Sequence, residues 1–261
     1  MSRVVLSPLT SREQLRAGRL PRRLVQLVFG LTLYGVSMAM MIRSKLGLDP
    51  WDVLHYGLAE RLPLTFGQVT MVVGVLVLLL WVPLRQWPGV GTVANVFVIG
   101  LATDAALALI PEPSALGSRG ALLFGGIALN GLAGGLYIGS QLGPGPRDGL
   151  MTGLTRRTGW SIRLVRTGIE VTVLSVGWLL GGVVGLGTVA YAILIGPLVQ
   201  FFLPRVTVRL HSPSAGEREG ERQDGVGPGP AQCLGRDGDG PAGVGEVVDE
   251  QDRSGHRGHR M

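Results

Sequence analysis

The chain has 261 residues, 46% of them hydrophobic and 16% charged, which is poor in charge for a soluble domain, and its apolar residues occur in long blocks. The net charge of +6 comes from residues 1–210, with 18 basic and 8 acidic side chains, and arginines flanking apolar blocks indicate membrane topology rather than nucleic-acid binding. A single cysteine, Cys233, excludes an internal disulfide framework and a cysteine metal cluster.

Residues 1–23 precede the first apolar block and carry six arginines against one acid, Glu13. Such a basic segment is expected to stay on the cytoplasmic side of the membrane. A secretory signal peptide is the alternative. The charged region is long, however, the apolar run exceeds a typical signal core, and no A-x-A cleavage site follows, so we favour an uncleaved first helix.

Six apolar stretches are long enough, or nearly so, to cross a hydrocarbon core about 30 Å thick. They are about Leu24–Ile42, Leu64–Leu84, Val90–Ile110, Ala121–Leu142, Leu164–Val184 and Leu186–Leu203. The sequence therefore predicts an all-α, polytopic membrane protein with about six transmembrane helices.

The chain contains an internal repeat with an offset of 96 residues. LGLDPWDVLHYGLAER, from Leu46, aligns without gaps to LGPGPRDGLMTGLTRR, from Leu142, with eight of sixteen positions identical. GVGTVANVFVIG, from Gly89, aligns in the same register to GLGTVAYAILIG, with seven of twelve identical. We therefore divide the membrane part into repeat 1 (24–110), a connection (111–120) and repeat 2 (121–205).

Three spans per repeat is an odd number, so the second copy is expected to insert upside down relative to the first, as in many transporters. If the motif helices at 50–62 and 146–158 also crossed the membrane, the copies would instead run parallel. Loop arginines do not separate the two arrangements. The length of the motif helices favours the inverted arrangement. These segments are short and polar, with Asp52, His55 and Glu60 in the first copy, and suit a re-entrant or interfacial helix better than a lipid-facing span.

The repeated motif predicts a helix break in each half. Gly47 and Pro50, and likewise Gly143 and Pro146, end one helix and begin another. Asp52 and Asp148 then fall in the first turn of the new helix, where an acid caps the helix or interacts favourably with its dipole. Capping is the simpler interpretation. The functional one is that two broken helices place these acids around a shared polar cavity.

Other polar residues within the spans are also candidates for lining that cavity: Asn95, Asp104, Asn130, Arg166 and Glu170. Each has a structural alternative. Arg166 and Glu170 are four residues apart and can form a local ion pair, Asp104 lies near a span end and can reach water, and the asparagines can bond neighbouring helices.

The sequence contains no recognisable nucleophile motif, metal-binding motif or nucleotide-binding loop, so we expect neither an enzyme nor a resident metal or cofactor. Residues 206–261 are rich in Gly, Pro and charged residues with few apolar clusters, which predicts a disordered cytoplasmic tail.

The residues LGLDPWDVLHYGL, a following Phe-Gly-Gln-Val and the later GTVANVFVIG resemble the YczE/YyaS/YitT family of bacterial integral membrane proteins over about Arg22 to Arg205. The resemblance implies a bacterial membrane protein and adds little mechanism. In the second copy, Arg147 replaces Trp51 and Tyr191 replaces Asn95, so the copies are not equivalent.

The leading hypothesis is a multi-pass plasma-membrane protein, with both termini cytoplasmic, that binds or transports a small molecule or ion where its two repeats meet. The alternative is a non-transporting membrane accessory that positions a partner enzyme through its arginine-rich inner face. The expected partners are the lipid bilayer and a small solute, and not nucleic acid.

Overall fold

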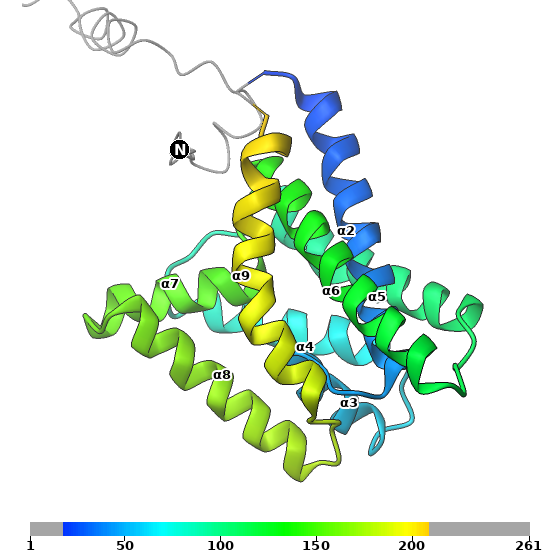
Figure 1. Cartoon of the computed structure of the whole chain (residues 1–261). Helices are drawn as coiled ribbons and strands as arrows, with labels where there is room; N and C mark the ends of the chain where they lie inside the picture. Colours follow the sequence, from blue (N-terminus) through cyan, green and yellow to red (C-terminus); the bar gives the residue numbers. More distant parts are fainter. Residues whose placement is uncertain (1–17, 209–261) are drawn as a thin grey trace, which may run out of the picture. The chain divides into compact units, whose positions relative to one another are not determined.

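The computed structural model describes residues 18–208, and eight α-helices account for most of this range (Figure 1). They are α2 (Leu20–Ser44), α3 (Pro50–Ala59), α4 (Phe66–Trp81), α5 (Val90–Leu109), α6 (Leu116–Gly139), α7 (Pro146–Thr158), α8 (Ile162–Leu179) and α9 (Leu186–Val206). This part of the chain contains no strand. Most of the predicted N-terminal segment and nearly all of the predicted tail lie outside the described residues.

Four of these helices, α2, α5, α6 and α9, are long and apolar enough to cross a membrane. The prediction of six spans is therefore met only in part. Helix α4 is apolar but has 16 residues, and α8 has 18 residues that include Arg163, Arg166 and Glu170. Large apolar side chains are exposed on the outer faces, as expected of a surface in contact with lipid. Examples are Val25, Leu79, Leu101, Phe124 and Ile193.

Helices α2 and α6 pack side by side and run antiparallel (Figure 1). Near the start of α2, Arg23 donates to the backbone oxygens of Ser140 and Gln141, just after the end of α6. At the other end, Arg119 near the start of α6 donates to Ser44 and Lys45. Each contact also satisfies carbonyls that a helix end leaves without partners.

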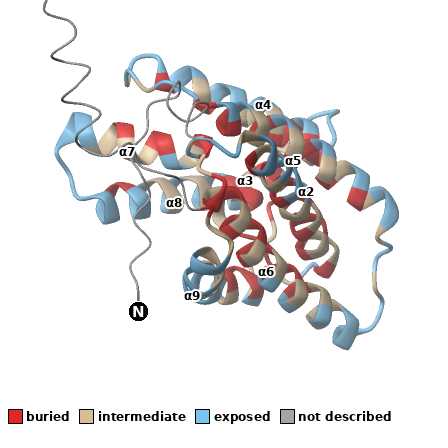
Figure 2. Cartoon of the chain, turned by 90° about the horizontal axis from the view of Figure 1, so that it is seen from above, coloured by how far each residue is buried: buried red, intermediate tan, exposed pale blue. Residues whose placement is uncertain are grey.

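Glycines bring these two helices close together at two places 96 residues apart. A Cβ on Gly30 would lie 3.0 Å from the backbone nitrogen of Tyr137, and one on Gly126 would lie 3.1 Å from the backbone oxygen of Ser37. Small residues at such crossings let two helix backbones approach closely in membranes. Buried residues, drawn red in Figure 2, are most numerous on α2 and α6 and occur also on α3, α4 and α5.

The short helices pack across the two halves. Helix α3 of the first half packs against α8 of the second, and α7 of the second half packs against α4 of the first. In contrast, α5 packs on α2 and α9 packs on α6 within the same half.

The loops before α3 and α7 make the same backbone bond twice. Gly187 donates to the oxygen of Leu46, and Gly91 donates to the oxygen of Leu142, both at 2.8 Å. The next residues, Gly47 and Gly143, have φ of +123° and +124°, a conformation that residues with a side chain rarely adopt. The glycine of the motif is therefore required by the backbone in both copies.

Candidate functional site

The first helix break places three titratable groups in the interior of the protein. Pro50 begins α3, and the N-cap residue Asp49 accepts a hydrogen bond from the backbone nitrogen of Asp52 at 2.7 Å. Asp49, Asp52 and His55 are three residues apart, so the helix carries them on neighbouring turns. They are only 4%, 1% and 2% exposed. Burying an ionised carboxylate costs free energy unless a cation is paired with it, so these acids require a positively charged partner.

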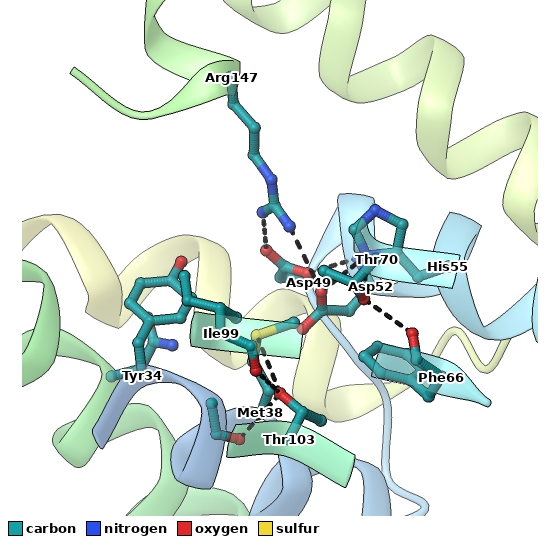
Figure 3. A network of polar contacts seen from close by, with 12 residues as sticks. Tyr34, Met38, Asp49, Asp52, His55, Phe66, Thr70, Ile99, Thr103 and Arg147 are labelled. Atoms are coloured by element: carbon teal, nitrogen blue, oxygen red, sulfur yellow. Dashed lines mark hydrogen bonds and ion pairs between the residues drawn. The ribbon is translucent and has the colours of Figure 1, made fainter. Parts of the chain in front are cut away.

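That charge comes from the second helix break. Arg147, in the first turn of α7, points toward α3, with its Nη1 atom 3.1 Å from Oδ2 of Asp49 and Nη2 3.5 Å from Oδ1 of Asp52 (Figure 3). Its guanidinium also lies over the ring of Trp51, 5.0 Å from the ring centre. Trp51 and Arg147 occupy equivalent positions of the two sequence copies. The two helix breaks thus meet through one cation shared by two acids and an aromatic ring.

His55 extends this network toward α4. Its Nδ1 atom lies 3.4 Å from Oδ1 of Asp52 and 3.4 Å from the hydroxyl of Thr70, which itself donates to the backbone oxygen of Phe66 (Figure 3). The ring of Phe66 meets the imidazole edge-on at 5.9 Å. With a proton on Nδ1, His55 would donate a hydrogen bond to the carboxylate of Asp52 and help to hold it in place.

Two cavities, with volumes of about 130 and 160 Å³, flank the Arg147 ion pair. The first, here the α4-side cavity, is lined mainly by α3, α4, α5 and the start of α7, and the second, the α8-side cavity, by α3, α7, α8 and α9. Four residues border both of them: Tyr34, Trp51, Arg147 and Asp148. Of the ion-pair residues, Arg147 borders both cavities, Asp49 borders the α8-side cavity, and Asp52 borders neither.

Asp148 differs from the other acids because it is exposed. It is one of the residues that line both cavities. Its carboxylate lies beside Gly145 and forms no ion pair within residues 18–208. A carboxylate held in this way is available to a molecule that enters either cavity.

The structure divides the other predicted residues into two groups. Asn95 borders the α4-side cavity, and Arg166 and Glu170, joined by an ion pair of 2.8 Å, border the α8-side cavity. Asp104 instead accepts hydrogen bonds from the Thr65 hydroxyl and the Gly67 backbone and so fixes the start of α4.

Asn130 also lies outside both cavities. Its side chain donates to the hydroxyl of Ser37 at 2.9 Å and accepts from the hydroxyl of Tyr191 at 3.2 Å. It therefore links α2, α6 and α9 in the buried core, the role expected of an interhelix hydrogen bond.

Sequence reasoning missed Asp49 and Arg147 as site residues. Asp49, one turn before Asp52, accepts the bond that caps α3, so Asp52 is left to face Arg147. A signal for Arg147 was present in the sequence, since an arginine replaces tryptophan in an otherwise matching motif. No group of three or more His, Cys, Asp or Glu among the described residues is arranged to hold a metal ion.

Comparison with known proteins shows the family of this chain. The sequence profile of a family described as a family of unknown function, DUF6198, matches residues 21–204. The chain belongs to this family. An uncharacterized protein of Haemophilus influenzae is 41% identical over 187 residues, covering 72% of this chain and 86% of that protein.

Two Bacillus subtilis proteins also match. The uncharacterized membrane protein YczE is 36% identical over 178 residues, covering 67% of this chain and 83% of YczE, and the uncharacterized protein YyaS is 28% identical over 184 residues, covering 68% and 90%. These matches confirm the predicted resemblance to YczE and YyaS, and with the apolar helices they establish a membrane protein. No solved structure matches the chain.

Proposed function

We propose that this protein binds a small solute at the interface of its two halves and moves it across the membrane. One observation carries the proposal. The ion pair between Arg147 and the acids of α3 joins the two broken helices, and a cavity lies on each side of it. Broken helices that meet at a polar, cavity-lined interface are typical of secondary transporters.

In this proposal the two halves form an inverted repeat. Two observations support this arrangement. Helices α2 and α6, which are equivalent in the sequence, run antiparallel. The backbone bonds from Gly187 to Leu46 and from Gly91 to Leu142 are equivalent and connect the halves in both directions.

The same relation suggests how the solute would pass. In an inverted repeat, α3 is equivalent to α7, α4 to α8 and α5 to α9. The helices that line the α4-side cavity are therefore equivalent to the helices that line the α8-side cavity. A protein that alternates between opening one cavity and opening the other would expose the Arg147 site to each side of the membrane in turn. The ion pair would close the path between the cavities in the state described.

We also propose that the protein lies in the bacterial plasma membrane with both ends of its helical part on the cytoplasmic side. Gln26 near the start of α2 donates to the backbone oxygen of Val206 at the end of α9, so these two helix ends lie on one side. Six arginines among residues 1–23 favour the cytoplasm for that side.

The proposal is tested by uptake and efflux in vesicles that contain the purified full chain, with a panel of cationic, anionic and neutral metabolites. Asp52→Asn combined with Asp148→Asn should abolish transport, because it removes two of the three carboxylates, Asp49, Asp52 and Asp148, at the interface of the two halves. Asp104→Asn is the matched control, since this carboxylate lies outside both cavities, and it should retain transport.

The proposal fails if no metabolite is bound or moved and if the double variant keeps the phenotype of the wild type in cells. In that case, crosslinking from the α7–α8 loop near Arg156 should capture one stoichiometric partner, the result expected of a membrane accessory.

A further inference from the structure

We infer that the solute is a small organic cation bearing an ammonium or guanidinium group, and that Arg147 occupies the binding site of that cation when the site is empty. This inference rests on the proposed function and adds the chemical class of the solute. It predicts that a soluble cation and the Arg147 side chain compete for the same two carboxylates.

The charge around the cavities is the first observation. Within residues 18–208, four carboxylates and two guanidinium groups lie in or next to the cavity walls: Asp49, Asp52, Asp148, Glu170, Arg147 and Arg166. The formal charge of this set is −2. Arg166 is already paired with Glu170, and Arg147 pairs with Asp49 and Asp52, so Asp148 has no ion-pair partner among the described residues. Ionised groups at membrane depth need partners, and a cation entering the cavities would supply one.

The contacts of Arg147 are the second observation. Its guanidinium binds two carboxylates and lies over the face of Trp51, the combination by which proteins recognise ammonium and guanidinium ligands. The two acids are almost fully buried, whereas the Arg147 side chain is 27% exposed. The two acids and the ring thus form a cation-binding site. In this structure the site is filled by the Arg147 guanidinium, whose side chain belongs to α7 and borders both cavities.

Asp148 is the third observation, and it is independent of the ion pair. It is the carboxylate that faces both cavities without an ion-pair partner in the described range. A cation in the α4-side cavity would border Asp148, and one in the α8-side cavity would border both Asp148 and Asp49. Displaced from these acids, Arg147 would be free to turn toward Asp148, and the bound cation would reduce the formal charge of the set from −2 to −1.

Cavity size limits the ligand. Cavities of about 130 and 160 Å³ resemble the engineered cavity of about 150 Å³ that accommodates benzene. Methylguanidinium, ethylammonium and tetramethylammonium fit this limit. An anionic ligand is the competing possibility, because α7 has no side-chain cap at Gly145 and its N-terminus attracts negative charge. The unpaired Asp148 in the first turn of that helix opposes it.

The test measures binding of methylguanidinium chloride to the purified full chain in detergent, by the rise in the unfolding temperature at constant ionic strength. Sodium acetate and urea at matched concentrations are the anionic and neutral probes. We expect saturable stabilisation by methylguanidinium alone. Asp148→Asn should weaken this binding by about tenfold, because it removes the accessible carboxylate. Asp104→Asn should not change it.

Arg147→Ala gives the sharper readout. Without its side chain, Asp49 and Asp52 lose their cation, so the variant should unfold at a lower temperature, and millimolar methylguanidinium should restore most of the loss. The affinity of this variant should be about tenfold higher than that of the wild type, because the tethered competitor is gone. If Arg147→Ala does not fold, Arg147→Lys keeps a cation, and methylguanidinium should compete with it as in the wild type.

Each outcome has a distinct meaning. Acetate binding that is lost in Arg147→Ala would overturn the cation inference and leave the proposed function standing. Methylguanidinium binding that is weakened by Arg147→Ala would overturn the competition. If no small solute of any charge binds or is transported, the proposed function itself fails.

Discussion

The two helix breaks have the same backbone and different side chains. Gly47 and Gly143 share a positive φ, and Pro50 and Pro146 each begin a helix. The positions around them differ, because Asp49 and Trp51 of the first copy correspond to Gly145 and Arg147 of the second. The first break carries two buried acids and an aromatic ring, and the second carries the cation that binds them. The two breaks therefore share a backbone conformation, while the side chains that differ between them are complementary in charge.

A second difference lies where each short helix packs on the other half. In one contact Gly177 of α8 packs closely on Val53 and Leu54 of α3, and in the equivalent contact Trp81 of α4 packs on Gly149 of α7. In the first contact the glycine is on α8 and the larger residues are on α3, whereas in the second the glycine is on α7 and the tryptophan is on α4. Trp81 is 1% exposed and donates its indole N–H to the backbone oxygen of Pro146.

The largest expected effect comes from making this contact alike in both halves. Gly149→Val introduces the residue of the first copy, and its Cβ would lie 1.9 Å from the ring of Trp81. We expect a loss of about 3 kcal/mol or more in the free energy of unfolding, measured by thermal or denaturant unfolding in detergent. The double variant with Trp81→Gly should lose less than the sum of the single losses. Strict additivity would contradict the packing account.

The next largest effect is expected when Asp49 of the first break is replaced by glycine, the residue at the equivalent position 145 of the second break. Asp49→Gly removes both the cap of α3 and the closest acid to Arg147. We expect a loss of about 2–4 kcal/mol, because the cap contributes about 1 kcal/mol and a buried ion pair that loses one partner costs more. Asp49→Asn keeps a capping oxygen without the charge, and should lie between Asp49→Gly and the wild type in the same unfolding measurement.

Gly47→Ala and Gly143→Ala test the shared backbone. Both positions have a positive φ, and an added Cβ would lie 2.8 Å from the nitrogen of Gly185 in the first case and 3.0 Å from the hydroxyl oxygen of Thr92 in the second. We expect each variant to lose about 1–3 kcal/mol in unfolding free energy. Gly196→Ala, where a Cβ meets nothing within 4 Å, is the control. A loss at only one break would contradict equal backbone roles.

The smallest effect concerns an ion-pair cluster that only one half has. Glu112, in the connection between the halves, accepts from Lys45 at 2.8 Å and pairs with Arg43, and the hydrogen bond from Lys45 holds the pKa of this carboxyl below its usual value. A lowered pKa in the folded state means that the contribution to stability is present above the ordinary pKa near 4.5 and is lost as pH falls through the folded value.

Glu112→Gln should therefore lower the unfolding temperature slightly at neutral pH. The difference from the wild type should shrink as the pH falls below about 4.5 and should also shrink in high salt, because the pair is exposed. A difference that is constant across this pH range would show that the charge of Glu112 is not its cause.

The sequence predicted features that depend on local pattern. The helical class, the break at each motif, and the ends of the second motif helix at Pro146 and Thr158 all follow from apolar runs and from glycine and proline. The first motif helix ends at Ala59, three residues before the predicted Leu62. The predicted spans containing α4 and α8 are shorter or more charged in the structure than a standard membrane span.

The composition of the site depended on tertiary contacts that no local pattern contains. Asp148 and Asn95 could be selected because they are polar residues in apolar surroundings. Asp49 could not, since an acid in a loop after a helix is unremarkable until Arg147, 98 positions later in the chain, is placed beside it. Asp104 and Asn130 met the same polarity criterion but have hydrogen-bond partners elsewhere.

The central claim is that the two cavities are equivalent spaces of an inverted pair of halves and open to opposite sides of the membrane. Gly74 borders the α4-side cavity, and Glu170, its equivalent in the second copy, borders the α8-side cavity. The direct measurement is labelling of Gly74→Cys and Glu170→Cys, each in a Cys233→Ser background, by a membrane-impermeant maleimide in right-side-out and inverted vesicles. The account predicts that the two cysteines are labelled from opposite sides, and labelling of both from the same side would contradict it.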